Sequence, residues 1–445
     1  MFANSIIALY LLASIIALVN PRFALLLFWP MIFFHPTFAL YGKLPLNIGF
    51  DDVYLVCLFA GSLIRFGGKL QVAWPVVMAI LFCVFGVLGE ISYVVAGAEV
   101  ETARVWKELL KSSGLILFVF SLSAMLVTPE QIKRMVYSLL LGSLLGAIFV
   151  MFYAIRPDAW NPFQIPYLLL GRETGGFQAL GPFDSHDIAG GVLGFSVLIG
   201  YFLIRFSKGA GKRLVIVVIT SFLLLGLLLS GSRSGWVFVA FPIMFSSLLS
   251  KQRILGFFLL ALIAIGFLAS VTAFPYLSGR VEQTMTQAKS WDPQMITHGR
   301  YTVWKETLAN ANKTWLFFGE GLSKKEGEKH THAHNNYIGM LKHMGLLSFI
   351  FWFLYYKRVI VRSSWLMKHD PIYYMSAIFK GVFWAYIGYL FFFMTCTPIL
   401  WPPVRYIDFF LMTLLCLRYR QLGVEAEHVT EDELYPAQLV YDQSY

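Results

Sequence analysis

The stretch His330-Thr331-His332-Ala333-His334-Asn335-Asn336-Tyr337 runs directly into a mainly apolar segment, Ile338 to Tyr356. This segment is close to the ~20 residues that cross a bilayer as a helix. The three histidines at alternate positions are a large share of the 9 histidines in the chain. The stretch therefore predicts a membrane helix whose end carries residues able to handle protons or phosphates.

The composition of the whole chain is that of a membrane protein. Hydrophobic residues make up 58% of its 445 residues and charged residues 13%, whereas soluble domains are about 25% charged. The mean hydropathy is +0.67. We therefore predict an all-α polytopic membrane protein with about 12 or 13 transmembrane helices of ~20 residues each. The apolar runs lie at 4–19, 22–38, 52–66, 71–95, 112–128, 131–154, 187–206, 213–230, 235–250, 252–272, 335–356, 376–397 and 402–418.

Basic residues orient these helices. Lys and Arg gather in the connections 205–213, 251–253 and 357–368, which the positive-inside rule places in the cytoplasm. Counting helices from these connections puts 155–186, 231–235 and 273–334 on the opposite, outer side. The net charge of +10 is mostly this topological signal, so no nucleic-acid partner is inferred.

The chain is expected to have one folded unit. Residues 1–420 are predicted to form a single transmembrane domain that includes the connections 155–186 and 273–334. The acidic residues after Arg420 predict a solvated, mobile cytoplasmic tail at 421–445. The first apolar run lacks a Lys/Arg-rich start and a small-residue cleavage site, so we expect a retained helix.

A few reactive residues fall inside the apolar runs. The four cysteines have no paired spacing and are interpreted as core residues: Cys57, Cys83, Cys396 and Cys416. Glu90 is the main charged residue expected within a span.

The connection 155–186 combines turn-forming and charged residues. It contains Arg172 between Gly171 and Glu173, and it ends in Asp184-Ser185-His186-Asp187. Either Asp184 or Ser185 can cap the helix that follows. Asp184 and His186 are also candidates to support a polar site.

Arg233 lies in a connection too short to be a solvated domain, Ser230 to Gly235. It must sit at or just inside the outer membrane surface, where an unpaired guanidinium is costly. Two interpretations stay open: a functional arginine, or one at a helix end that extends its charge to the interface.

The connection 273–334 is the one large hydrophilic excursion. A helix-like stretch begins near Arg300, with Val303, Leu308 and Ala311 able to pack on one face, and Phe317 to Leu322 follows as a turn. This loop is therefore expected to be partly helical. It can act as a lid over an outward cavity, or residues 299–312 can lie on the membrane surface as an amphipathic helix.

Together these residues predict an anion site at the outer face of the membrane. Arg233 and Arg300, with Arg172 as a further contact, would offer guanidinium forks that suit diphosphate oxygens. His334 can accept a proton from an attacking hydroxyl, because an imidazole ordinarily has a pKa of about 6.5. The alternative is a metal site of His330, His332 and His334, since alternate residues of an extended segment point the same way. No acidic cluster on that loop completes it.

In these motifs the chain resembles the bacterial O-antigen ligase and polysaccharide polymerase superfamily of integral-membrane glycosyltransferases. The resemblance covers about residues 170–355, while the runs before it agree only in hydropathy. At Asp184 to Asp187 the chain departs from the family's Pro-Asn type of turn. The matching stretches are Arg172 with Gly181-Pro182-Phe183, Ser230 to Ser234, Gly299-Arg300 with Trp304, Gly319-Glu320-Gly321, and Ala333 to Tyr337 leading to Gly345-Leu346.

The resemblance implies a GT-C-like, inverting and metal-independent enzyme of the bacterial inner membrane, without a cofactor. Such an enzyme takes a glycan linked to undecaprenyl pyrophosphate and transfers it, on the periplasmic side, to a sugar hydroxyl. Carried onto this chain, Arg233 and Arg300 would hold the pyrophosphate, with Arg172 as an additional contact. His334 would activate the acceptor. Asn335 would orient the imidazole or cap the helix, and the other supporting candidates are His332, His186 and Asp184.

Two branches of the superfamily share this chemistry. A ligase uses the lipid A core as acceptor, and a polymerase uses the growing glycan. The loop with Arg300 ahead of a His-Asn helix start favours the ligase. A transporter or flippase would also explain the many helices, but its ionisable residues usually lie near the middle of the membrane. Here the informative ones gather at one face.

Overall fold

The computed structural model describes residues 2–34, 50–67, 74–95, 102–126, 128–156, 180–183, 185–249, 253–274, 300–309, 335–396 and 402–423, with short pieces within 278–289, residues 317–319 and residue 321. Within these ranges the secondary structure is helical, without strands. The helices are α1 (Phe2–Val19), α2 (Pro21–Phe33), α4 (Phe50–Phe66), α5 (Trp74–Val95), α6 (Thr102–Met125), α7 (Pro129–Ile155), α9 (His186–Phe206), α10 (Ala210–Leu229), α11 (Arg233–Leu248), α12 (Arg253–Ala273), α15 (Arg300–Ala309), α17 (Asn336–His369), α18 (Tyr373–Phe392) and α19 (Pro402–Gln421).

The prediction of an all-α polytopic membrane protein is confirmed. Every predicted apolar run overlaps a helix, and α15 lies in the large predicted loop. Among the described residues, six helices are long and apolar enough to cross a membrane: α5 (over Trp74–Ser92), α7, α9, α10, α17 and α18. Shorter apolar helices lie at Ile7–Val19, Pro21–Phe33, Ser112–Met125 and Ala264–Ala273.

Helix α9 lies at the centre of one half of the bundle, where it packs against α18, α10, α11 and α7. Its glycines permit this close packing. A side chain at Gly194 would collide with the ring of Phe238, and one at Gly200 would collide with Thr220. Small residues let membrane helices approach each other closely.

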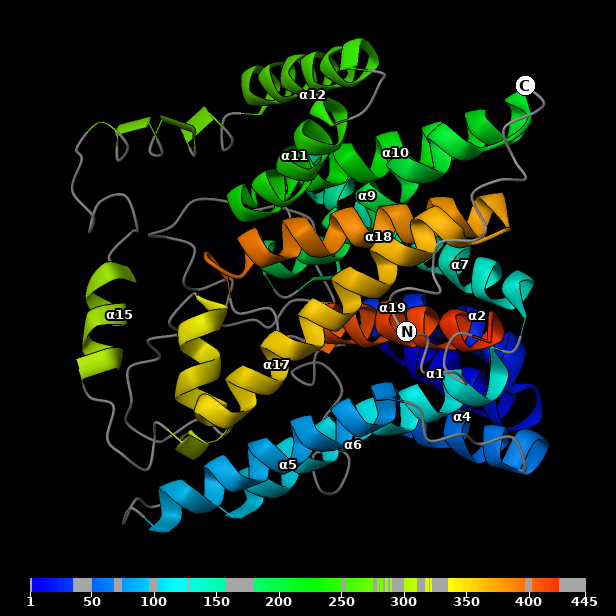
Figure 1. The fold of residues 1–445 in the computed structure, drawn as a ribbon, viewed down its shortest axis with the longest axis vertical. Helices are drawn as coiled ribbons and strands as arrows, with labels where there is room; N and C mark the ends of the chain where they lie inside the picture. The colour runs from blue at the N-terminus through cyan, green and yellow to red at the C-terminus, as the bar shows by residue number, and fades with distance from the viewer. Residues whose placement is uncertain are drawn as a thin grey trace, which may run out of the picture.

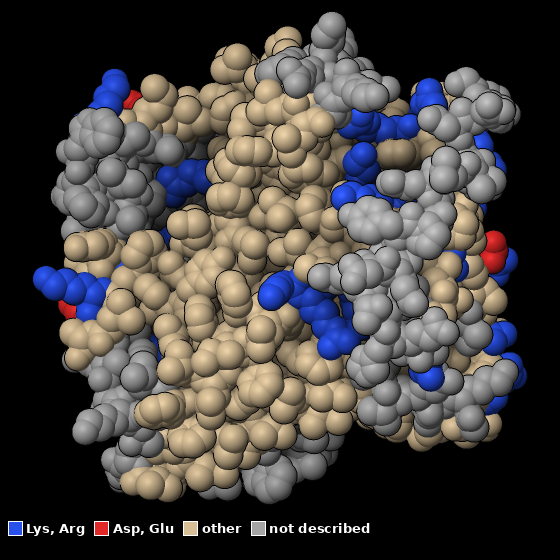
Figure 2. Space-filling view, viewed as in Figure 1, with Lys and Arg blue, Asp and Glu red and all other residues tan. Residues whose placement is uncertain are grey.

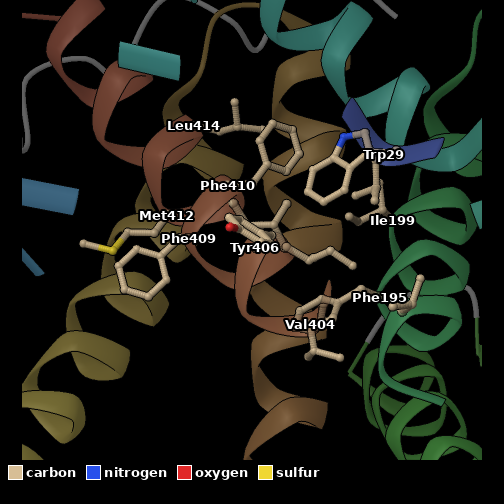
Figure 3. Packing of buried hydrophobic residues seen from close by; sticks show 14 of the residues in the cluster. Trp29, Phe195, Ile199, Val404, Tyr406, Phe409, Phe410, Met412 and Leu414 are labelled. Carbon is tan, nitrogen blue, oxygen red and sulfur yellow. The ribbon is translucent and has the colours of Figure 1, made fainter. Parts of the chain in front are cut away.

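Helix α19 fills the centre of the bundle with large side chains. Figure 3 shows Phe409 and Phe410 of α19 in the core, with Trp29 of α2 and Phe195 of α9 nearby. The ring centroids of Trp29 and Phe410 are 5.1 Å apart at an interplanar angle of 69°. Such tilted contacts between rings stabilise a core beyond the burial of area.

Glu90 was predicted as the main charged residue within a span, but other charged residues of the helices are buried as well, so that prediction was incomplete. Asp408 of α19 is 2% exposed. Its carboxylate accepts hydrogen bonds from the hydroxyls of Tyr355 and Tyr356 of α17 at 2.9 Å each, and from the hydroxyl of Tyr386 of α18. The carboxylate therefore joins three helices.

The basic stretch 357–368, predicted to lie on the cytoplasmic side, belongs to α17, which continues as a helix to His369. The basic side chains of this stretch lie against aromatic rings. The Arg358 guanidinium lies 4.7 Å from the ring of Trp74, and that of Arg362 lies 4.9 Å from the ring of Tyr419. Long basic side chains can pack their stems on apolar surface, so their charge does not end the helix.

The helices run mostly side by side, so the bundle they form has two ends (Figure 1). At one end α11 and α17 begin and α18 ends, and α15 lies beyond this end, at the left of the view. We call it the site end. At the opposite end, the inner end, α9 and α17 finish and α10 and α18 begin. Of the predicted tail, the structure describes only residues up to Gly423.

Candidate functional site

The turn that follows α18, residues 393–396, is the point at which separate parts of the chain meet. We call it the α18 turn. Arg300, the first residue of α15, donates a hydrogen bond from Nη1 to the carbonyl oxygen of Thr395 at 2.9 Å. The predicted loop helix is therefore tied to the bundle through its arginine. A guanidinium has five N–H donors, so this bond leaves others for an anion.

Asn335 joins the start of α17 to the same turn. Its Oδ1 accepts hydrogen bonds from the backbone N–H groups of Tyr337 at 3.0 Å and Ile338 at 3.2 Å, which confirms the predicted helix cap. Its Nδ2 donates to the carbonyl oxygen of Met394 at 3.3 Å. His334 directly precedes this anchored residue in the chain.

Arg233 is the first residue of α11 rather than part of a connection that continues to Gly235. Gly231 makes the turn possible with a φ of 70°, which glycine adopts without strain. Ser232 caps the helix by accepting a hydrogen bond from the N–H of Gly235 at 3.1 Å. Arg233 is partly exposed. A guanidinium at a helix N-terminus adds to the positive end of the helix dipole, and this combination favours anions.

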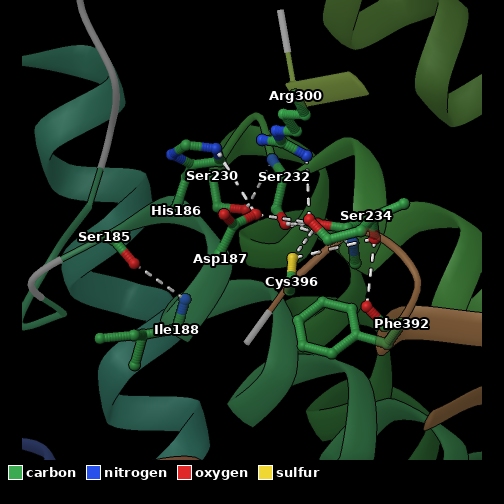
Figure 4. A network of polar contacts seen from close by, with 12 residues as sticks. Ser185, His186, Asp187, Ile188, Ser230, Ser232, Ser234, Arg300, Phe392 and Cys396 are labelled. Carbon is green, nitrogen blue, oxygen red and sulfur yellow. Dashed lines mark hydrogen bonds and ion pairs between the residues drawn. The ribbon is translucent and has the colours of Figure 1, made fainter. Parts of the chain in front are cut away.

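A buried polar network connects α9, α11 and the α18 turn (Figure 4). The hydroxyl of Ser234 donates to Oδ1 of Asp187 at 2.8 Å. The Cys396 thiol donates to Ser234 Oγ at 3.2 Å, and the hydroxyl oxygens of Ser232 and Ser234 are also 3.2 Å apart. Nε2 of His186 lies 3.5 Å from Oδ1 of Asp187. We call these five residues the Asp187 network.

Arg300 of α15 brings a positive charge close to the Asp187 network. Arg300 points toward it from α15 in Figure 4, with His186 beside it, and the guanidinium interacts electrostatically with the Asp187 carboxylate. Burial first, and then the Asp187 carboxylate, raise the pKa of the Cys396 thiol. The thiol is therefore protonated and serves as a hydrogen-bond donor. Cys396 is a core residue as predicted, but it also belongs to the network.

The helix cap before this network is Ser185. Its hydroxyl oxygen accepts a hydrogen bond from the N–H of Ile188 at 3.1 Å, which decides between the two predicted caps, Asp184 and Ser185. His186 then begins α9, and the structure brings it to the site as proposed for a supporting residue.

A turn of the large loop packs on the bend of α17. The N–H of Gly321 donates to the carbonyl oxygen of His343 at 2.9 Å, and Nδ1 of His343 lies 2.8 Å from the carbonyl oxygen of Gly321. A side chain at Gly321 would collide with the carboxylate of buried Glu90. Gly345, with a φ of 74°, bends α17 at this point and faces the backbone of Phe317. Glu90 therefore lies against the loop at the site end.

Helix α15 has less packing than predicted, since Leu308 is 52% exposed.

Four predicted site residues lie outside the described residues, namely Arg172, Asp184, His332 and His334. The alternative metal site, with His330 as its third ligand, lies outside them too. Within the described part of the chain, no group of three or more His, Cys, Asp or Glu side chains could hold a metal ion.

Asp187 and Cys396 are the site residues that sequence reasoning missed. Asp187 ended the quoted motif Asp184 to Asp187, but only the fold shows that its carboxylate is buried beside Ser234. The three serines around Arg233, at positions 230, 232 and 234, were a signal for a buried polar acceptor that was not followed.

Comparison with known proteins agrees with this geometry. A family model described as O-antigen ligase matches residues 218–353, which include Arg233, Arg300 and His334. A search of the curated proteins finds no match. The matched residues and the resemblance in the motifs point the same way: over residues 218–353 the chain is similar to the O-antigen ligase family.

Proposed function

We propose that this protein is an O-antigen ligase-type glycosyltransferase. It would move a glycan from undecaprenyl pyrophosphate to a sugar hydroxyl of the lipid A core at the periplasmic face of the inner membrane. The observation that carries this proposal is the convergence at the α18 turn. Arg300 contacts this turn, the neighbour of Arg233 contacts it, and Asn335, next to His334, contacts it as well.

The two arginines are assigned to the diphosphate of the donor. Arg233 comes from the start of α11 and Arg300 from the start of α15. Two guanidinium groups near one turn can each offer paired N–H donors to phosphate oxygens. As the leaving group departs, these donors would stabilise the charge that develops on its oxygens. Arg172 is proposed as a further contact.

His334 is assigned to the acceptor. Its imidazole would take the proton of the sugar hydroxyl while the hydroxyl oxygen forms a bond to the anomeric carbon of the donor glycan. The bond between that carbon and the diphosphate oxygen breaks on the opposite face, and its electron pair leaves with the undecaprenyl pyrophosphate. The configuration is inverted. In this scheme the charge of the leaving group is stabilised by arginine side chains.

Asp187 is proposed as a positioning residue of this site. Its carboxylate interacts with Arg300 and is held by the hydroxyl of Ser234, next to Arg233. The negative charge can hold the Arg300 guanidinium near Arg233 before the donor arrives. His186 lies on the same carboxylate and would add to the positive charge around it when protonated.

The proposed location can be tested by thiol labelling. Tyr301 follows Arg300 and is 47% exposed, while Lys208 is exposed at the inner end. In cells with a permeabilised outer membrane, an impermeant thiol reagent should label Tyr301→Cys but not Lys208→Cys. Lys208→Cys should react once the inner membrane is opened, with the native chain as the blank. The reverse labelling pattern would place Tyr301 on the cytoplasmic side and would contradict a periplasmic site.

Deleting the gene tests the function itself. A ligase deletion should leave the lipid A core without polymer while lipid-linked polymer accumulates. Core that carries a single repeat unit would instead identify a polymerase. The polymerase is the alternative from the same superfamily, since both enzymes need the same diphosphate and base chemistry. A lipopolysaccharide gel distinguishes these outcomes. Lipid-linked glycan confined to the cytoplasmic face would point to a flippase.

A further inference from the structure

Helix α17 bends at Gly345, so its first residues, 336–344, form a short helical segment of their own, about 13 Å long. We call this segment the α17 arm. Its start is fixed at the α18 turn, where the N–H of Asn336 donates to the carbonyl oxygen of Phe393 at 2.7 Å. His334 precedes this start by two residues. Because a helix is held together along its axis by its own hydrogen bonds, the position of the start also depends on what holds the other end of the arm.

The other end of the arm is tied to the turn of the large loop by two hydrogen bonds between the same two residues. The N–H of Gly321 donates to the carbonyl oxygen of His343 at 2.9 Å, and Nδ1 of His343 lies 2.8 Å from the carbonyl oxygen of Gly321. A carbonyl oxygen can only accept, so Nδ1 carries the proton of this second bond. The imidazole of His343 therefore has a fixed orientation, and the arm ends on the backbone of the loop turn.

Helix α5 packs on this junction through Gly89 and Glu90. A Cβ at Gly89 would lie 2.5 Å from the backbone nitrogen of Gly321 and 2.8 Å from the carbonyl oxygen of His343. A Cβ at Gly321 would collide with the carboxylate of Glu90. The three segments of backbone thus meet with no room for a further methyl group. We call Gly89, Glu90, Gly321 and His343 the α5 clamp.

The carboxylate of Glu90 is buried in the α5 clamp, and the residue is only 4% exposed, although it lies within the apolar span of α5. Figure 2 shows mostly uncharged surface across the middle of the face that α5 and α17 share in Figure 1, with Lys and Arg toward its sides. An ionisable residue in a membrane span is costly and is usually retained for a function. Because this carboxylate lies against Gly321, its function concerns the loop turn and the end of the arm.

We propose that the α5 clamp positions the proposed base, with Glu90 and His343 as positioning residues. This inference rests on the proposed role of His334. The α18 turn would hold the start of the arm and the α5 clamp its end, so that together they set where the imidazole of His334 lies relative to the acceptor hydroxyl. Arg233 and Arg300 come from other helices. Loss of the clamp should therefore slow the transfer step and leave donor binding nearly unchanged.

Gly89→Ala tests the α5 clamp with one methyl group. Alanine favours a helix more than glycine does, but its methyl must push the backbone of Gly321 away by roughly 1 Å to reach an ordinary contact. A misplacement of about 1 Å can cost about 10²-fold in rate. Gly89→Ala should therefore lower kcat by about that factor at nearly constant donor KM. The backbone N–H of Gly321 should exchange with deuterium about tenfold faster, as measured by mass spectrometry on peptides that contain it.

Matched variants separate the α5 clamp from general effects. An added Cβ at Gly266 of α12 would meet nothing within 4 Å, so Gly266→Ala makes the same chemical change and should leave kcat and exchange unaltered. His343→Leu removes the donor to Gly321 and should resemble Gly89→Ala. His343→Asn offers an amide N–H near the position of Nδ1, so it should restore most of both readouts. Glu90→Ala, which opens space beside Gly321, should also speed exchange and lower kcat, whereas Glu90→Gln keeps the shape and should be milder.

The two readouts distinguish the possible outcomes. Faster exchange at Gly321 with a native kcat in Gly89→Ala, His343→Leu and Glu90→Ala would overturn the positioning role while leaving the proposed function intact. Exchange that stays slow in these variants would show that the contacts do not hold the turn, and would overturn the clamp itself. An equal change in kcat and donor KM would move the effect to the donor site and also contradict the proposal. No transfer by the native chain would instead remove the proposed function, and the assignment of the clamp to the base with it.

Discussion

The two ends of the bundle carry positive charge in different surroundings. At the site end, Arg300 and His186 lie around a buried carboxylate that hydroxyl and thiol donors hold in place. At the inner end, Arg205 of α9 and Lys380 of α18 lie over aromatic rings of α9. Oriented polar partners fix the direction of a charged group, whereas rings fix only its depth in the membrane. The difference indicates chemistry at the first end and anchoring at the second.

His334 should produce the largest effect at the site end. Loss of a general base typically costs about 10²–10⁴-fold in rate, so His334→Ala should remove most transfer while donor binding persists. His332→Ala should be milder. Transfer from lipid-linked glycan by each purified variant, at equal protein level, measures this. A rate for His334→Ala within the range of His332→Ala would leave the site without its proposed base.

The arginines should come next. Removal of one donor that stabilises transition-state charge costs about 10²–10³-fold, so Arg233→Ala and Arg300→Ala should each fall in that range. Lysine at either position keeps the charge but not the paired N–H geometry. The lysine variants should therefore lose less transfer rate than the alanine variants but more than the native chain. The transfer rate of the four variants checks the order. If both alanine variants transfer normally, Arg233 is only an interfacial residue.

Asp187 should have a smaller effect, because it acts through Arg300. Asp187→Asn keeps the shape and an acceptor for Ser234 but removes the charge. The loss of a hydrogen-bonded charge typically costs enough to lower donor affinity about tenfold, seen as a raised KM with a smaller change in kcat. Cys396→Ser, which keeps a donor, is the matched control. A fall in kcat without a change in KM would contradict a positioning role.

Asn335 should affect stability more than chemistry. Replacing a helix-capping Asn by Ala costs about 1 kcal/mol, so Asn335→Ala should lower the thermal stability of the purified protein slightly. The start of α17 would then loosen next to His334. Thermal unfolding followed by circular dichroism measures the change. An unchanged melting temperature would mean that the contact of Asn336 with the α18 turn is sufficient to hold the helix start.

The inner end should show the smallest effect on transfer. Arg205→Gln and Lys380→Gln lie away from the site, and such substitutions usually change free energies by less than about 0.5 kcal/mol. Transfer rates in one fixed lipid mixture should therefore stay within about twofold of the native rate. A loss as large as that of Arg300→Ala would remove the distinction between the two ends.

Much of the fold could be predicted because apolar run length is a local property. Each run reappears as a helix, including the run that begins at Asn335. The bend at Gly345 could not be predicted, since it depends on the backbone of Phe317 packing against that glycine. The extension of α17 to His369 was missed because its basic residues were interpreted only as a signal for a connection.

The site could be predicted in part for the same reason. Arg233 stood out because an unpaired guanidinium at the outer membrane surface is costly. Arg300 stood out at the start of the helix-like stretch in the large loop, and Asn335 stood out as a cap. Asp187 and Cys396 did not, because their role arises from a contact between α9, α11 and the α18 turn. Such contacts between distant parts of the chain carry no local pattern.

A reconstituted transfer reaction tests the central claim most directly. The purified protein is mixed with lipid-linked glycan and lipid A core in the presence of EDTA, and the glycan attached to the core is measured. The native chain should form this product, and Arg300→Ala and His334→Ala should form almost none. Product that disappears with EDTA and returns with Mg²⁺, Mn²⁺ or Zn²⁺ would contradict the arginine and histidine mechanism and favour the three-histidine metal site.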